Sequence, residues 1–429
     1  MAGRVAEAVM EQEIKNEMKQ RILAELDMSQ EIDDMEVRRL VDQCIMEYKG
    51  MTELPLPARI KLRKELFNTV RRMDVLSEFL EDESVTEIMI NGYDNIFIER
   101  SGRVYKVDQT FENEERLASI IQQIVAGCNR IVNEAVPIVD ARLADGSRVN
   151  VVLPPISLNG PTMTIRKFPK EKMTMERLIE IGALSEDAAE FLERLVKARY
   201  NIFVSGGTGA GKTTFLNALS DYIPQQERVI TIEDSAELQL KNVVNLVRLE
   251  SRNSNVEGTN AVTIRELIKS SLRMRPDRVI VGEVRDAAAI DMLAAMNTGH
   301  DGSLSTGHAN SSGDMITRLE SMVLMGMELP LEAVRRQIAS AVDVIIHLGR
   351  LRDGSRKVLE IAEVTGMREG LVELHTIYEF EEMVAGEEQK VTGRLRARSE
   401  LLHQEKFLRA GIAYKSVLCA EVRSDGAGV

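Results

Sequence analysis

The stretch Val204-Ser205-Gly206-Gly207-Thr208-Gly209-Ala210-Gly211-Lys212-Thr213-Thr214 decides how this chain folds. Residues Gly206–Thr213 fit the pattern G-x-x-x-x-G-K-[ST]. The apolar run Tyr200–Val204 predicts a short strand before the glycines, and Thr213–Tyr222 has helical composition. Strand, glycine loop and helix therefore follow in the order that a phosphate-binding loop requires. The alternative is a glycine-rich loop that merely turns the chain, and this context counts against it.

The residue types of this stretch suit a nucleotide. Glycines let the backbone curl so that several N–H groups point at one phosphate, and the start of the helix adds partial positive charge. Lys212 supplies a cation for the β and γ phosphates, and Thr213 offers a hydroxyl to Mg²⁺. The residues that we expect to bind the nucleotide are Gly206, Gly207, Thr208, Gly209, Ala210, Gly211, Lys212, Thr213 and Thr214.

Composition narrows the class of protein. A length of 429 residues allows two or three domains. The net charge of −13 and the aromatic share of 4% argue against a protein that coats nucleic acid. Cys44, Cys128 and Cys419 lie far apart, so neither a zinc site nor a disulfide framework is indicated, and a reducing cytoplasm fits. No apolar run approaches the length of a membrane span, so any work at a membrane is expected to be peripheral.

The periodicity of apolar residues predicts four segments. They are a helical N-terminal extension (1–58), a smaller α+β domain (59–168), a linker (169–175) and an α/β domain with a helical C-terminal tail (176–429). The α/β domain alternates helical segments with short apolar strands, which predicts a parallel sheet covered by helices. Its predicted strands are Asn201–Val204, Val229–Ile232, Leu246–Leu249, Arg278–Val281 and Asp343–Leu348.

The ends of the chain read as mostly helical. Residues 1–50 predict two or three helices, Gly50–Pro57 a linker, and Ala58 to Leu80 a further helix. In the tail we expect a helix at Arg394–Arg409 and disorder at Ser424–Val429.

Acidic residues follow two of the predicted strands. Glu233, Asp234 and Glu237 follow the second strand, and Glu283 follows the fourth. Ligands bind at the carboxyl ends of parallel strands, so these carboxylates can hold magnesium-bound water or polarise an attacking water. Glu283 resembles the acid of a Walker B element, displaced from its strand by Gly282. The alternatives are a surface turn or helix cap for the first group and a solvated glutamate for Glu283.

Two of the five histidines, His300 and His308, lie in the glycine-rich run Thr298–His308, which reads as a loop. Zinc is not expected there, because no further Cys or His lies near in sequence. Neutral imidazole suits a group that orients or senses the γ-phosphate. A structural role is the alternative, and we expect it for the remaining histidines, His347, His375 and His403.

Arginines gather in both domains. Those in the α+β domain are Arg142, Arg148 and Arg166, and those in the α/β domain are Arg265, Arg273, Arg275 and Arg278. Guanidinium grips phosphate oxygens in a planar, bidentate way. We expect at least one arginine of the α+β domain to reach the phosphates, where an arginine from a neighbouring domain or subunit can stabilise the transition state. A surface ion pair is the alternative for any one of them.

Together these motifs resemble the secretion ATPase superfamily of type II and type IV machines. Gly206–Thr213 matches its Walker A motif, Thr231–Glu237 its Asp box, Asp277–Arg285 its unusual Walker B motif and Gly299–His308 its His box. The resemblance implies a RecA-like P-loop domain that hydrolyses ATP with Mg²⁺. It also implies that Glu237 or Glu233 activates the attacking water and that Glu283 supports Mg²⁺.

The first domain is most similar to that of the CpaF/TadA ATPases of tight-adherence pili. The similar stretches are Glu87–Gly92, Val139–Leu143, Asp145–Asn150 and Thr164–Phe168. This resemblance implies a PAS-like first domain and a homohexamer at the cytoplasmic face of the inner membrane. Its partners would be inner-membrane platform proteins and, indirectly, pilin, with no nucleic acid. Closure of the first domain on the second around Pro169–Lys172 would convert hydrolysis into movement.

Two other functions stay open at this stage. A nucleic-acid-dependent RecA-like motor shares the P-loop core, although the acidic charge and scarce aromatics count against it. An ATP-gated scaffold would bind nucleotide and recruit partners with little turnover. A GTPase is disfavoured because no Asn-Lys-x-Asp run occurs in the chain.

Overall fold

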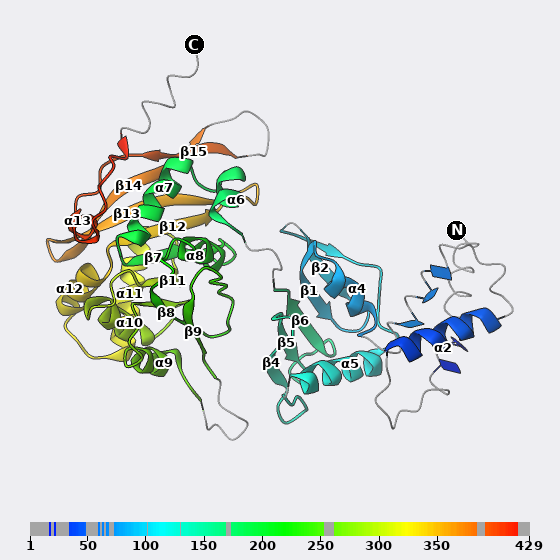
Figure 1. Cartoon of the computed structure of the whole chain (residues 1–429). Coiled ribbons are helices and arrows are strands. Elements are labelled where there is room, and N and C mark those ends of the chain that lie inside the picture. The colour runs from blue at the N-terminus through cyan, green and yellow to red at the C-terminus, as the bar shows by residue number, and fades with distance from the viewer. Residues whose placement is uncertain are drawn as a thin grey trace, which may run out of the picture. The chain divides into compact units, whose positions relative to one another are not determined.

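A computed structural model of the chain divides it into two compact units, Met1–Lys170 and Glu171–Val429 (Figure 1). It describes residues 17–18, 21–22, 34–48, 59–60, 62–63, 66–67, 73–100, 102–128, 130–168, 173–252, 261–383 and 391–418. Cys419 and the expected segments Gly50–Pro57, Pro169–Lys172 and Ser424–Val429 lie outside these ranges. Among the described helices, none combines the length and the apolar character needed to cross a bilayer.

The first unit begins with a small helical cluster. Helix α2 (Asp34–Glu47) buries Val37, Val41 and Cys44, which are spaced three or four residues apart and so share one face. The apolar residues that pack with them are Met18, Ile22, Leu62, Leu66 and Phe67.

The helix expected from Ala58 to Leu80 is not continuous, so that prediction is wrong. Residues 59–60, 62–63 and 66–67 are helical, but Met73 and Asp74 are not, and Asp74 has a left-handed φ of 55°. A separate helix, α4 (Val75–Glu81), follows. The residues before the break pack in the helical cluster, whereas α4 packs on the sheet described next, so the chain turns between two cores.

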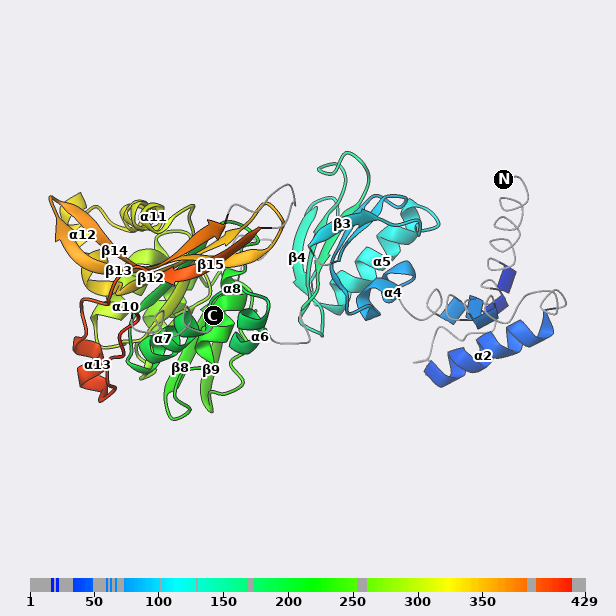
Figure 2. The same cartoon turned by 90° about the horizontal axis from the view of Figure 1, so that it is seen from above.

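An antiparallel sheet in the order β3-β2-β1-β6-β5-β4 forms the body of the first unit. Its strands are β1 (Val85–Asn91), β2 (Ile96–Arg100), β3 (Arg103–Lys106), β4 (Ile138–Arg142), β5 (Arg148–Val152) and β6 (Thr162–Arg166). Alternate residues such as Ile88 and Ile90 are fully buried. Their partners in the core come from α4 and α5 (Glu114–Gly127), which lie beside the sheet (Figure 2).

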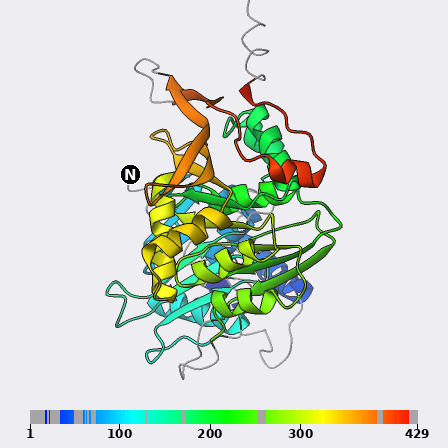
Figure 3. The ribbon, with the colours of Figure 1, turned by 90° about the vertical axis from the view of Figure 1, so that its left-hand side faces the viewer.

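The second unit is built on a nine-stranded sheet in the order β15-β14-β13-β12-β7-β11-β10-β8-β9. Its parallel strands are β7 (Ile202–Gly206), β8 (Arg228–Glu233), β9 (Asn245–Glu250), β10 (Arg278–Val281), β11 (Leu304–His308) and β12 (Val344–Arg350). Its antiparallel strands are β13 (Arg356–Arg368), β14 (Leu371–Met383) and β15 (Thr392–Ala397). The predicted parallel sheet is confirmed: its five expected strands are present as β7, β8, β9, β10 and β12, and β11 adds a sixth that was not expected. Three antiparallel strands extend the sheet at one end, where Figure 3 shows β13 and β14 in orange.

Helices cover both faces of this sheet. Along β7, Ile202 and Val204 belong to one apolar core and Phe203 to the other, as alternation along a strand requires. The first core includes α6 (Met175–Glu180), α7 (Glu186–Lys197), α8 (Lys212–Ser220) and α13 (Glu405–Ala410). The second includes α9 (Ile264–Ser271), α10 (Ala288–Asn297), α11 (Ser312–Gly326) and α12 (Leu331–Ala341).

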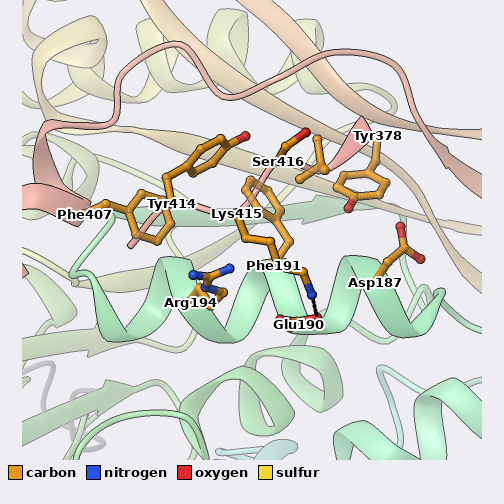
Figure 4. Close-up of a pocket in the computed structure, with 10 residues that line it drawn as sticks. Asp187, Glu190, Phe191, Arg194, Tyr378, Phe407, Tyr414, Lys415 and Ser416 are labelled. Atoms are coloured by element: carbon orange, nitrogen blue, oxygen red, sulfur yellow. Dashed lines mark hydrogen bonds and ion pairs between the residues drawn. The ribbon is translucent and has the colours of Figure 1, made fainter. Parts of the chain in front are cut away.

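The tail is helical only in part, which corrects the prediction of a helix at Arg394–Arg409. Its first residues form β15, because Leu395 and Ala397 alternate inward and pair with β14, whereas α13 supplies the helical part. Beyond α13, the chain packs on α7 around a small cavity of about 20 Å³ (Figure 4). Lys415 forms an ion pair with Glu190 there. A cavity of that size has no room for a nucleotide, so it is not the functional site.

Candidate nucleotide site

Three glycines shape the loop between β7 and α8. A Cβ at Gly206 would lie 2.6 Å from the carbonyl oxygen of Leu348, so no larger residue fits without moving β12. Gly209 and Gly211 have φ angles of 72° and 92°, in the left-handed region that favours glycine. Gly211 directly precedes α8, and no side chain among the described residues caps this helix. Uncapped N–H groups at a helix N-terminus bind anions.

Lys212 begins α8 and lies against the loop. It is only 8% exposed, and its Nζ donates a hydrogen bond of 3.1 Å to the carbonyl oxygen of Gly207. The same Nζ lies 3.2 Å from Nδ1 of His308. The lysine and the histidine that the sequence singles out are therefore in direct contact.

His308 ends a strand rather than lying in a loop. The run Thr298–His308 was expected to be a loop throughout, and its second half is β11. This half forms a strand because Leu304, Ser305 and Thr306 are buried between β7 and β10. The parallel register with β7 places His308 opposite Gly206, at the start of the phosphate loop.

The contacts continue from His308 to two further charged groups. His308 Nε2 lies 3.0 Å from Glu283 Oε1, and Arg285 donates a hydrogen bond of 2.8 Å to Glu283 Oε2. Arg285 also lies 3.5 Å from the exposed carboxylate of Asp234. A chain of contacts thus runs from the phosphate loop through an imidazole and a carboxylate to the surface.

The protonation states along this chain follow from its surroundings. Burial and the neighbouring Lys212 cation lower the pKa of His308, so its imidazole is neutral at neutral pH. Lys212 Nζ lies 3.2 Å from Nδ1 and 3.4 Å from Nε2 of this neutral ring, so whichever nitrogen carries no hydrogen can accept from the lysine. Burial opposes ionisation of Glu283, but the hydrogen bond and charge of Arg285 outweigh it and hold the pKa of Glu283 below its usual value.

Glu233 ends β8 and is 3% exposed. Its Oε1 accepts hydrogen bonds of 2.8 and 3.0 Å from the backbone N–H groups of Glu237 and Leu238, whereas Oε2 has no hydrogen-bond partner. Burial raises the pKa of Glu233 in spite of these two donors. One carboxylate oxygen thus fixes the turn that carries Glu237, which is half-buried, and the other is left to bind something else.

Gly282 explains why the Walker B acid is displaced by one residue. The N–H of Gly282 donates a hydrogen bond to the carbonyl oxygen of Ile232 on β8. The segments that follow β8 and β10 therefore lie close together. A Cβ at Gly282 would lie 2.9 Å from Cγ of Glu233. Glycine at this position makes room for the Glu233 side chain beside Glu283.

The remaining residues that were predicted to bind the nucleotide lie in the loop and in the first turn of α8. Gly207, Thr208 and Gly209 are exposed, and Ala210 is buried. Thr213 is half-buried and Thr214 is exposed, both in the first turn of α8.

The structure does not bring His300 to this group. His300 precedes β11, whose five residues separate it from the edge that carries the phosphate loop, a distance of about 16 Å. Its Nδ1 lies 3.2 Å from the carbonyl oxygen of Ala295 at the end of α10.

The arginines of the second unit also lie elsewhere. Arg278 begins β10, is fully buried and binds Glu227 and the carbonyl oxygens of Val196 and Gly302. Arg265 forms an ion pair of 2.6 Å with Asp291, and Arg273 and Arg275 are exposed.

The three arginines of the first unit form a row. Arg142 pairs with Arg148 across β4 and β5, and Arg148 pairs with Arg166 across β5 and β6. Residues directly opposite each other in an antiparallel sheet share one face, so the three side chains leave the same face of the sheet. Arg142 also donates a hydrogen bond to the carbonyl oxygen of Gly146, and Arg166 is exposed.

Comparison with known proteins identifies the family. A family model described as type II/IV secretion system protein matches residues 71–417. The chain belongs to this family. Membership together with the phosphate loop makes it an ATP-hydrolysing secretion ATPase, and the predicted α/β fold with a RecA-like P-loop domain is confirmed.

Relatives of this secretion ATPase support the assignment. This chain is 34% identical to a putative conjugal transfer protein of Mycobacterium tuberculosis over 331 residues. The aligned region covers 76% of this chain and 93% of the relative. Over 322 residues it is 33% identical to the type IV secretion system protein VirB11 of Brucella suis, with coverage of 68% and 88%. The crystal structure of the pilus retraction motor PilT with ADP is 18% identical, has a TM-score of 0.50, and covers 82% of this chain and 87% of PilT. At that identity the likeness to PilT shows the fold alone.

Two residues of the secretion ATPase site escaped the sequence analysis. Arg285 was part of the Walker B match, and the acid two residues before it was the available signal. Arg356 on β13 donates a hydrogen bond of 2.7 Å to the carbonyl oxygen of Gly209 in the phosphate loop. No motif marks Arg356, because the hairpin that carries it is defined only by strand pairing.

Proposed function

We propose that this chain is the motor subunit of a pilus-assembly or protein-secretion machine of the CpaF/TadA branch. It would act as a homohexamer at the cytoplasmic face of the inner membrane, with platform proteins of that membrane as partners and pilin as the indirect load. The observation that carries this proposal is the contact chain from Lys212 through His308 to Glu283, which joins Walker A, His box and Walker B in one site. Family membership supports the secretion role.

Each motif has a proposed task in the hydrolysis of ATP to ADP and phosphate. Lys212 and the backbone N–H groups of the loop hold the β and γ phosphates. Neutral His308 keeps Lys212 oriented by accepting a hydrogen bond from it. Of the two candidates for activating the attacking water, Glu233 is favoured, because its pKa is raised and its Oε2 has no hydrogen-bond partner. Glu237 lies in the turn that Glu233 Oε1 holds.

The oxygen donors of the site fit magnesium. Thr213 contributes a half-buried hydroxyl and Glu283 an ionised carboxylate, which are hard ligands of the kind Mg²⁺ prefers. Within the described ranges, no three His, Cys, Asp or Glu side chains gather to hold a metal, so phosphate oxygens and water would complete the shell. The ion would neutralise phosphate charge.

The arginine row of the first unit is proposed to meet the phosphates. Arg142, Arg148 and Arg166 put three cations on one face of a rigid sheet, which suits the charge that develops on transferred phosphate. The segments 1–58, 59–168, 169–175 and 176–429 would then be extension, closing domain, hinge and motor domain. His300 lies far from the phosphate loop, so we propose that it affects the site only indirectly, by holding the segment that leads into β11.

The first experiment measures ATPase rate per subunit against protein concentration with magnesium. We expect a rate that rises steeply with concentration, and no turnover in Lys212→Ala. The matched control is Lys197→Ala, an exposed lysine of the same unit that pairs with Glu193. A rate that is independent of concentration, or equal in Lys212→Ala, contradicts the proposal and favours the ATP-gated scaffold. Stimulation by DNA that falls steeply with salt would favour the nucleic-acid motor.

Mixing two inactive variants tests whether the arginines act between subunits. In a mixed ring, some interfaces combine the intact Lys212 of an Arg166→Ala subunit with the intact Arg166 of a Lys212→Ala subunit. These interfaces form complete sites if the arginine acts on the neighbouring subunit. Recovered activity in the mixture supports trans action. A mixture as inactive as its components places the arginine in the same subunit as the lysine, or outside the reaction.

A further inference from the structure

The hairpin between β12 and β13 returns the chain to the phosphate loop. Arg356, the first residue of β13, donates from Nε to the carbonyl oxygen of Gly209 at 2.7 Å. Its Cδ lies 3.4 Å from the position that a Cβ would take at Gly211. The side chain thus lies along the outside of the loop and spans the two glycines with left-handed φ angles.

This hydrogen bond fixes the direction of one peptide group. A trans peptide is planar, so the carbonyl of Gly209 and the N–H of Ala210 point in opposite directions. With the carbonyl held outward by Arg356, the N–H points inward, where it donates to the carbonyl oxygen of Gly207 at 3.3 Å. That oxygen also accepts the hydrogen bond from Lys212. Because glycine rotates freely, an unanchored Gly209 would let this peptide turn its oxygen toward the phosphates.

The hairpin that carries Arg356 is itself fixed. Asp353 accepts hydrogen bonds from the N–H and the hydroxyl of Ser355, and its other oxygen accepts from the N–H of Val391. These donors hold the pKa of Asp353 at about 2, so its carboxylate keeps them throughout the ordinary pH range. The strand pair continues with Arg350 opposite Arg356. Arg356 therefore projects from a turn with little freedom.

The charge of Arg356 is also unbalanced. Its neighbour Arg352 forms an ion pair with Glu382, but Arg356 forms none with any carboxylate of the described residues. A guanidinium without a carboxylate partner raises the positive potential of the loop that it touches. Orientation and charge both favour an anion inside the loop.

We propose that Arg356 is a positioning residue for the nucleotide: it holds the Gly209–Ala210 peptide with its N–H turned inward and adds a cation behind the phosphate loop. The inference rests on the ATP site proposed above. It concerns binding of the diphosphate part that ADP and ATP share, and not the hydrolytic step.

The test compares three variants of the full chain by titration with a fluorescent ADP analogue and by steady-state ATPase kinetics. Arg356→Ala is expected to raise the Kd for ADP and the KM for ATP about tenfold, which equals about 1.4 kcal/mol, with kcat within about twofold of the wild type. Arg356→Lys, which keeps a charged donor, is expected to recover at least half of this loss. The control Arg352→Ala, on the same hairpin, is expected to leave Kd and KM unchanged.

Three outcomes overturn the inference. They are a Kd for Arg356→Ala equal to that of Arg352→Ala, a fall in kcat with unchanged KM, and no recovery in Arg356→Lys. Where Arg356→Ala unfolds, Arg356→Gln replaces it, since glutamine keeps a donor without the charge and should bind ADP less tightly than Arg356→Lys. Lys212→Ala separates the two proposals. If it binds ADP as tightly as the wild type, the nucleotide site itself is wrong. If only Lys212→Ala loses binding, the role of Arg356 alone fails.

Discussion

Gly282→Ala adds a single methyl group at a place in the site where it would meet the side chain of Glu233. The new Cβ would lie 2.9 Å from Cγ, 3.4 Å from Oε1 and 3.5 Å from Cβ of Glu233. Because Gly282 is tied to Ile232 by a backbone hydrogen bond of 2.8 Å, the side chain of Glu233 must move rather than the backbone.

The size of the effect follows from these contacts. An ordinary contact distance of 3.4–4 Å requires a shift of about 0.5–1 Å at Cγ. Overpacking of this kind costs about 1–3 kcal/mol of folding free energy. For a domain of this size, that lowers Tm by about 2–12 °C. The same shift moves Oε2, and misplacement of a reacting group by about 1 Å costs about 100-fold in rate.

The assay is steady-state ATPase activity beside thermal unfolding. We expect kcat to fall about 100-fold while KM for ATP changes by less than about threefold, because Lys212 and its loop lie on another strand. Gly313→Ala is the matched control: the nearest atom to its Cβ is 3.9 Å away, and the residue lies within α11. A kcat for Gly282→Ala within about threefold of the control would refute the role that we assign to Glu233.

Two further predictions concern stability. Arg278→Met removes a fully buried guanidinium that binds Glu227 and two backbone carbonyls, so the free energy of unfolding should fall by about 3–5 kcal/mol in urea titration. The exposed Arg273→Met should change it by less than about 0.5 kcal/mol, and equal values would contradict this reasoning. Burial lowers the pKa of His347 in the folded protein below its ordinary value of 6.5. As the pH falls through 6.5, His347 is therefore protonated in the unfolded chain before it is protonated in the folded protein. The free energy of unfolding should therefore fall as the pH drops through 6.5. In His347→Gln, which can still form a hydrogen bond with Ser205, it should fall less between about pH 7.5 and pH 5.5 than in the wild type. A larger fall in the variant than in the wild type would refute this assignment.

The parts of the site that could be predicted are those encoded in a short run of sequence. Gly206–Thr213 could be recognised from its sequence alone, and Gly209 and Gly211 adopt the left-handed φ angles that its glycines allow. Glu233 and Glu283 were found because an acid after an apolar strand marks the carboxyl edge of a sheet. Their mutual packing at Gly282 was not predictable, because it depends on the approach of two strands that are distant in sequence.

The differences between the expected and the observed structure have a common cause in tertiary pairing. His300 and His308 look alike in sequence, but the strand between them carries them to opposite edges of the sheet. Arg278 belongs to an arginine cluster for which a surface ion pair was the alternative, and its ion pair proved to be buried, because only the fold brings Glu227 to it. The strand at Arg394–Ala397 was read as helix, since its charged residues hide the alternation until β14 pairs with it.

The position of β7 in the sheet has a consequence for how the chain is made. Its two neighbours, β11 and β12, come from much later in the sequence, and the contact between Ser205 and His347 spans 142 residues. At ribosomal speeds of about 5–20 residues per second, about 7–28 seconds pass between the two sides of that contact. The glycine loop is therefore translated long before the strands that shape it, and a nascent chain that stops before β12 leaves one edge of β7 without its backbone hydrogen-bond partners. Nucleotide binding should appear late in synthesis, and until then this segment is the part of the chain most in need of protection from aggregation.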